Sequence, residues 1–106
     1  MRINYPETIR KYTDEEILQE VDFINQVGEQ EISSATVIVR NVKEEKDFSA
    51  LALGAEPEIT IDGSKVSFFI KDTLPAGKYT ARVLAETANE KRNYPFRLWV
   101  SDVFAS

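Results

Sequence analysis

The sequence predicts an all-β fold, an antiparallel β-sandwich of about seven strands. From Ile32 onward most of the chain alternates apolar and polar residues, which is the period of a strand with one buried face. Turn-forming residues separate these segments at fairly regular spacing. The 106 residues leave no room for the crossover helices that a parallel sheet needs. By length this is one domain, which we divide into an N-terminal arm over residues 1–13 and the sandwich over residues 14–106.

The N-terminal third of the sandwich admits two interpretations. Thr13 and Glu16 have the spacing of a capping box, which would begin a helix within residues 13–24. The same segment is compatible with a strand from about Ile17 to Phe23, because Ile17, Val21 and Phe23 share one face of a strand. Periodicity alone cannot decide so short a segment. We favour the strand and keep the helix as the alternative.

Two segments with different patterns follow. "EISSATVIVRNV" predicts a strand with Ala35, Val37 and Val39 on one face. The next segment, "KEEKDFSALALGAEPE", predicts a short strand around Ser49–Leu53 with turns on both sides.

"EITIDGSKVSFFIKD" predicts a hairpin around Asp62-Gly63. Both residues tolerate positive φ, which a type I′ turn requires at its two central positions. After the turn, alternate residues from Val66 to Ile70 share one face, and Phe69 points the other way.

"GKYTARVLAE" and "NYPFRLWV" predict two long strands joined by the polar loop "TANEKRN". Pro95 has no N–H group, so it should lie at an exposed edge or near the start of the last strand. The positions predicted to face the core are Tyr79, Ala81, Val83, Ala85, Tyr94, Phe96, Leu98 and Val100.

Gly77 and Tyr79 begin the first of these two strands. In immunoglobulin-like domains a small residue precedes strand F, and a Tyr two residues before the second Cys bonds through its hydroxyl to upstream backbone, the tyrosine corner. The stretch "GKYTA" resembles that pattern, with Ala81 at the Cys position, so apolar packing must replace the disulfide. The simpler alternative is that Tyr79 is a β-forming residue at a strand start. The resemblance implies an immunoglobulin-like sandwich with Tyr79 and Gly77 as structural residues.

A wider resemblance covers residues 17–101. "VDFINQVGEQEISSATVIV", "GSKVSFFI", "LPAGKYTARVLAET" and "YPFRLWV" resemble small single-domain immunoglobulin-like structural proteins of tailed phages and prophages. The core aromatic often found there in the strand around Val37 is missing, and Phe68, Phe96 and Tyr94 would have to supply its volume. The matching residues are Asp22-Phe23, Gly28, Ile32, Ala35, Val37, Val39, Ala76-Gly77-Lys78-Tyr79-Thr80, Phe96, Leu98 and Val100.

This resemblance implies a structural or accessory protein, associated with the virion and acting through protein–protein contacts. That the protein is non-enzymatic is an expectation from the absence of His, Cys and any catalytic motif. Its partners would be other particle proteins, further copies of itself, or both. It would be found in the virion, or in the host cytoplasm during assembly.

Composition narrows the function classes. The chain has no Cys and no His, so thiolate metal sites, disulfides and the commonest general base are excluded. The net charge is −5, and no block of Lys and Arg appears, which argues against nucleic acid as a partner. The apolar runs are too short for a transmembrane helix, and the polar start "INYPETIRKY" is unlike a signal peptide.

The carboxylates could in principle supply paired acids for glycoside hydrolysis, but nothing in the sequence shows two of them converging. Asp62-Gly63 lacks the spacing of a calcium loop, no serine has a His partner, and the glycines are scattered. We therefore expect no catalytic residues, no metal site and no cofactor. The acids considered are Asp14, Glu15, Glu16, Glu44, Glu45, Asp47, Glu56, Glu58 and Asp72.

Alternation also predicts a candidate interface. If the last strand buries Phe96 and Leu98, then Arg97 and Trp99 point outward, and Arg82 and Leu84 do so on the preceding strand. We expect Arg82 or Leu84 opposite or diagonal to Trp99, on a face suited to a partner or to a sheet-to-sheet homo-oligomer.

Two alternatives to this interface remain open. Trp99 could be an exposed aromatic that an Arg stem or the N-terminal arm covers. Alternatively, the domain could be a carbohydrate- or surface-binding module, which would require Trp99 or Tyr94 in an open groove.

Overall fold

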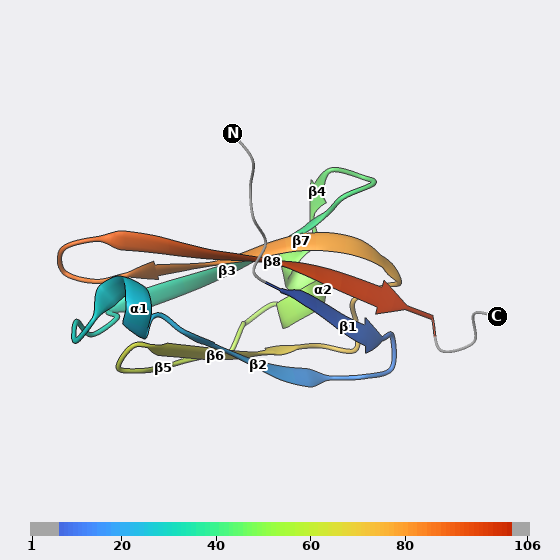
Figure 1. Cartoon of the computed structure of the whole chain (residues 1–106). Helices are drawn as coiled ribbons and strands as arrows, with labels where there is room; N and C mark the ends of the chain where they lie inside the picture. The colour runs from blue at the N-terminus through green and yellow to red at the C-terminus, as the bar shows by residue number, and fades with distance from the viewer. Residues whose placement is uncertain (1–6, 103–106) are drawn as a thin grey trace.

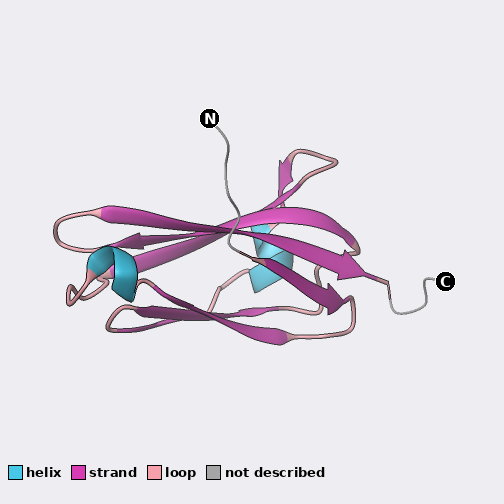
Figure 2. Cartoon of the chain, viewed as in Figure 1, coloured by secondary structure: helices cyan, strands magenta, loops and turns pink. Residues whose placement is uncertain are grey.

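The computed structural model describes residues 7–102. Two sheets stack face to face, one with strand order β1-β8-β7-β3-β4 and one with order β2-β6-β5 (Figure 1). Two short helices, α1 and α2, complete this part of the chain (Figure 2). The predicted all-β sandwich is confirmed, with eight strands within residues 7–102 rather than about seven. The strands are β1 Thr8–Tyr12, β2 Ile17–Asp22, β3 Ser34–Asn41, β4 Lys46–Asp47, β5 Ile59–Asp62, β6 Lys65–Ile70, β7 Gly77–Glu86 and β8 Lys91–Ser101; the helices are α1 Ile24–Val27 and α2 Ser49–Leu53.

Strand β1 lies within the segment expected to be an arm, residues 1–13. It pairs in parallel with β8, from Thr8 opposite Arg97 to Tyr12 opposite Ser101. The sequence gives little sign of this strand, because the inward position 11 holds a lysine. Residues 1–6 of the expected arm lie outside the described residues.

The first segment of the sandwich is a strand, as favoured. β2 pairs antiparallel with β6, from Ile17 opposite Ile70 to Asp22 opposite Lys65. The alternative helix over residues 13–24 is not formed, and only the single turn of α1 follows β2. The Asp22 Oδ1 accepts the Ile24 N–H at 3.0 Å, which stabilises the start of that turn.

The expected strand around Ser49–Leu53 is wrong, because this segment forms α2. Ser-Ala-Leu-Ala-Leu combines strong helix formers, and the neighbours Ala52 and Leu53 are both buried, which strand alternation does not allow. The Asp47 Oδ1 accepts the Ser49 N–H at 2.7 Å just before the helix.

The β5–β6 hairpin exists, but its turn differs from the prediction. Asp62 pairs with Lys65, so the two loop residues are Gly63 and Ser64 rather than Asp62 and Gly63. Of the two loop residues, Gly63 has a positive φ of 61° and Ser64 does not. Glycine at the first central position is the pattern of a type II′ turn, which replaces the expected type I′ turn.

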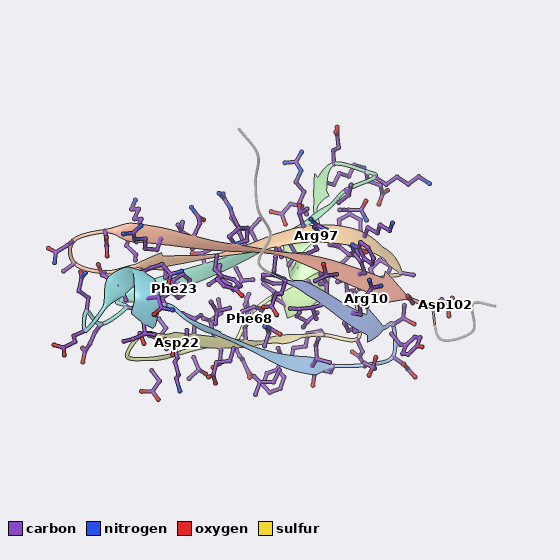
Figure 3. All side chains as sticks on the ribbon, in the orientation of Figure 1. Arg10, Asp22, Phe23, Phe68, Arg97 and Asp102 are labelled. Atoms are coloured by element: carbon purple, nitrogen blue, oxygen red, sulfur yellow. The ribbon has the colours of Figure 1, made fainter. Side chains whose placement is uncertain are left out.

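The faces of β7 and β8 are as predicted. Pro95 lies at an open edge of β8, as expected. The Arg97 N–H donates to the Glu7 carbonyl, so the nitrogen of Pro95, two residues earlier, points to the same edge of β8. The pairing of β1 with β8 begins only at Thr8 and Arg97, so within the described residues this nitrogen has no strand to bond to. Phe23 and Phe68 lie between the sheets, and Arg97 lies on the outer side of the larger one (Figure 3). Phe68 stacks on Phe96 with ring centroids 6.3 Å apart.

Neither helix of the described part is long or apolar enough to cross a membrane.

Candidate interaction surface on the five-stranded sheet

The outer face of the five-stranded sheet is basic, although the whole chain is acidic. Inward side chains alternate with outward ones along β1, β8, β7 and β3, so each strand contributes outward positions to this face. The described cations on this face are Arg10, Arg40, Lys78, Arg82, Lys91 and Arg97, and the described anions are Asp47 and Glu86.

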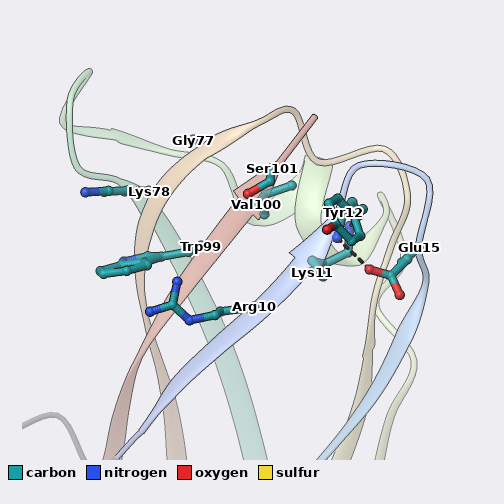
Figure 4. A pocket seen from close by; sticks show the side chains of 9 residues that line it. All are labelled: Arg10, Lys11, Tyr12, Glu15, Gly77, Lys78, Trp99, Val100 and Ser101. Atoms are coloured by element: carbon teal, nitrogen blue, oxygen red, sulfur yellow. Dashed lines mark hydrogen bonds between the residues drawn. The ribbon is translucent and has the colours of Figure 1, made fainter. Parts of the chain in front are cut away.

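Trp99 lies in the middle of a row of three side chains on this face. Its cross-strand neighbours are Arg10 on β1 and Lys78 on β7. The Arg10 guanidinium carbon lies 4.3 Å from the centroid of the indole ring, and the Lys78 Nζ lies 4.7 Å from it. Figure 4 shows the two cations on opposite sides of the ring. Both distances are within the range of a cation–π interaction, which holds these side chains in place.

The four predicted interface residues all lie on this face, but they do not form one cluster. Arg82 is opposite Pro95 and Leu84 is opposite Asn93, four and six residues along β8 from Trp99. The expectation that Arg82 or Leu84 lies opposite or diagonal to Trp99 is therefore wrong. The pairing register of β7 and β8 could not be predicted from the sequence, because the loop between these strands is shorter than the polar segment "TANEKRN" suggested. An interface role for the four residues stays a prediction.

Sequence reasoning missed Arg10 and Lys78. Lys78 could have been found, because it precedes the inward Tyr79 on an alternating strand and so points to the same side as Arg82. Arg10 could not, since its position depends on the pairing of β1 with β8.

A hollow of about 510 Å³ lies beside this row, at the end of β1 and β8. Arg10, Lys11, Lys78 and Glu15 line it with Trp99 (Figure 4). The Glu15 Oε1 accepts the Tyr12 N–H at 2.6 Å, so the turn after β1 holds this carboxylate. Three cations and one carboxylate make the hollow basic.

Lys11 is a buried amine, with 3% of its surface exposed. Its Nζ donates to the Tyr12 carbonyl at 2.7 Å. Burial lowers the pKa of Lys11, and the nearby carboxylates of Glu15, Asp72 and Asp14 partly oppose this shift. No carboxylate pairs directly with Lys11 within residues 7–102.

The carboxylates with shifted pKa values accept hydrogen bonds within the adjacent turns. Hydrogen bonds from the Ser64 hydroxyl and the Ile24 N–H lower the pKa of Asp22. Hydrogen bonds from Ser49 lower the pKa of Asp47. Within residues 7–102 no group of three or more acidic side chains is placed to hold a metal ion.

Tyr79 has the geometry of a tyrosine corner. Its hydroxyl donates to the Pro75 carbonyl at 2.7 Å, and 1% of its surface is exposed. Burial raises the pKa of the phenol. Gly77 has a φ of 157°, which residues with a side chain rarely adopt, whereas a Cβ there would make only ordinary van der Waals contacts, 3.5 Å from this hydroxyl and 3.4 Å from the Asn41 Nδ2. Ala81 is buried at the position where a Cys would stand.

No known protein family and no curated protein matches the chain. Solved structures do. An immunoglobulin-like domain of titin, a member of the I set, matches with a TM-score of 0.56 and 19% identity over 94% of this chain and 98% of that one. The fold is immunoglobulin-like. The titin M3 domain matches at a TM-score of 0.52 and 19% identity, covering 90% of this chain and 88% of that one. A chain of the complex of titin M10 with obscurin-like 1 matches at a TM-score of 0.51 and 16% identity, covering 97% of this chain and 94% of that one.

These likenesses concern the fold alone. The part of the expectation that concerns phages rests on the sequence resemblance.

Proposed function

We propose that the chain is a non-enzymatic component of a phage or prophage particle, a structural or accessory protein that works through protein–protein contacts. The observation that carries the contact function is the basic outer face of the five-stranded sheet, with Trp99 held between Arg10 and Lys78. Trp and Arg are enriched at protein interfaces, where a few such side chains provide most of the binding energy. The phage assignment is supported by the sequence resemblance over residues 17–101.

A non-enzymatic role agrees with the chemistry of the side chains. The chain has neither His nor Cys. Its two carboxylates with lowered pKa values accept hydrogen bonds from adjacent turns, which accounts for the shifts without a reacting group.

The alternative carbohydrate-binding function needs an aromatic ring with one open face. Trp99 has a cation against each face of its ring. Tyr94 packs edge-on against Phe23, and its hydroxyl donates to the Glu7 carboxylate at 3.1 Å. Neither ring is presented for stacking on a sugar, so this function ranks second. Binding on a glycan array that Trp99→Ala abolishes would reverse the ranking.

The test of the proposed function is quantitative proteomics of purified particles from the source organism. We expect the chain in fixed stoichiometry to the particle proteins, at constant ratio across a density gradient. An unrelated abundant cytoplasmic protein serves as the contamination control and should fall away through the gradient. A chain that falls away in parallel with that control would overturn the particle assignment.

A further inference from the structure

We propose that the row Arg10–Trp99–Lys78 and the hollow beside it bind the carboxylates of an acidic polypeptide segment on the partner protein. This inference rests on the proposed function, since it names the chemical class of the partner that meets this face.

The first argument is the uneven distribution of charge. The outer face of the five-stranded sheet carries more described cations than anions, whereas the whole chain carries −5. The surfaces outside this face are therefore strongly acidic. A basic face on an acidic domain selects a partner of opposite charge and guides the approach of that partner.

The second argument is that the cations beside Trp99 lack carboxylate partners among the described residues. Elsewhere Lys65 pairs with Glu20 at 3.8 Å and Lys71 pairs with Glu16 at 3.2 Å. Arg10 and Lys78 have no ion pair within the described residues, although acids outnumber bases in the chain. Their charges are available to a partner.

The third argument is preorganisation. The indole ring holds both cations by its faces, so their conformational freedom is already reduced before binding. A guanidinium that stacks on an aromatic ring keeps its N–H edge free, and that edge matches the two oxygens of a carboxylate. Arg10 is thus placed to bind a carboxylate in bidentate fashion, with Lys78 as a second point of attachment.

An acidic polypeptide fits this face better than two other occupants. A second copy that docked through the same face would place like charges opposite one another. A nucleic acid carries dense charge over a long distance and would meet the acidic surfaces that surround the face. A short acidic segment meets only the basic row, because charges beyond about 8 Å are screened at physiological salt.

The experiment uses an oligoglutamate peptide as the probe and Trp99, the chain's one tryptophan, as the reporter. We expect the peptide to change the emission of Trp99 at low ionic strength, and the change to vanish in about 1 M salt, where the Debye length is about 3 Å. Titration calorimetry on the same samples gives the Kd without relying on the fluorophore.

The double variant Arg10→Gln/Lys78→Gln should bind the peptide about tenfold more weakly, as expected for the loss of two exposed ion pairs. The matched control is Lys65→Gln/Lys71→Gln, which removes the same charge from β6 and the residue that follows it and should leave the Kd within about twofold. Thermal melts of both variants check that the fold is retained.

The proposal would be overturned by no binding of oligoglutamate at low salt, by equal weakening by both double variants, or by binding of duplex DNA as tight as that of the peptide. Self-association of the free chain that Arg10→Gln/Lys78→Gln abolishes would also overturn it, because the occupant would then be a second copy. Particle proteomics reports on the proposed function separately. A chain that is present in particles but does not bind the peptide has a partner of another class.

Discussion

Tyr79 joins the start of β7 to the loop before it through one partly buried hydrogen bond. Replacement by Phe keeps the ring but leaves the Pro75 carbonyl without its donor. We expect Tyr79→Phe to lower the free energy of unfolding by about 1 kcal/mol or somewhat more. Tyr12→Phe, which alters an exposed side chain, is the control and should have an effect within about 0.5 kcal/mol. An unchanged urea midpoint for Tyr79→Phe would contradict a stabilising role for this bond.

The buried amine of Lys11 links stability to pH. Burial holds the pKa of Lys11 below its ordinary value of 10.5, so the unfolded chain binds this proton more tightly than the folded chain. Between the lowered pKa and 10.5, this group's contribution to the free energy of unfolding therefore rises as the pH rises. We expect Lys11→Met to be more stable than the wild type at neutral pH, and the difference to shrink as the pH approaches 10.5.

Urea denaturation of both proteins across this pH range measures that difference. Tyr79 and Tyr94 have raised pKa values, so their titration lowers stability at high pH, but it cancels in the comparison. Lys43→Met, which removes a charge from an exposed lysine, controls for net charge. If the difference in the free energy of unfolding between Lys11→Met and the wild type stays constant or widens as the pH rises, burial of the amine is not the cause of that difference.

At the scale of elements, the strands with clear alternation were predictable. β3, β6, β7 and β8 follow a period of two because one face of each packs on the core. The elements that were missed owe their structure to something other than alternation. α2 forms in a segment too short for periodicity to separate a helix from a strand. β1 forms because its backbone pairs with the backbone of β8 at the edge of that strand.

The pairing register of the strands was the second feature that the sequence could not predict, and it determined how much of the candidate site could be predicted. Alternation placed Trp99, Arg97, Arg82 and Leu84 on the outer face. It could not say which side chains are adjacent, because cross-strand neighbours depend on where each turn begins and ends. The hairpin around Gly63 shows the same effect, since a shift of one residue changed the turn from type I′ to type II′.

At the scale of the whole molecule, charge is segregated between surfaces. The outer face of the five-stranded sheet is basic, and the surfaces outside it carry nearly all of the described acids. A two-fold contact brings one patch against itself, so a sheet-to-sheet homodimer would place Arg10, Lys78 and their neighbours against like charges. The desolvation of these cations would add to the unfavourable energy. This distribution argues against the symmetric homo-oligomer that the alternation pattern suggested.

We therefore expect the isolated chain to be monomeric at micromolar concentration in low salt. Raising the ionic strength screens repulsion between like charges, so any association through this face should strengthen with salt rather than weaken. Sedimentation velocity at low salt and at about 1 M salt measures both effects. Trp99→Glu is the informative variant, because its carboxylate would lie between Arg10 and Lys78 and neutralise part of the row. It should remain a folded monomer, since Trp99 contributes to the outer face and the core on the other side of β8 is unchanged. A wild-type dimer in low salt that Trp99→Glu converts to a folded monomer would contradict the electrostatic argument and restore the sheet-to-sheet contact.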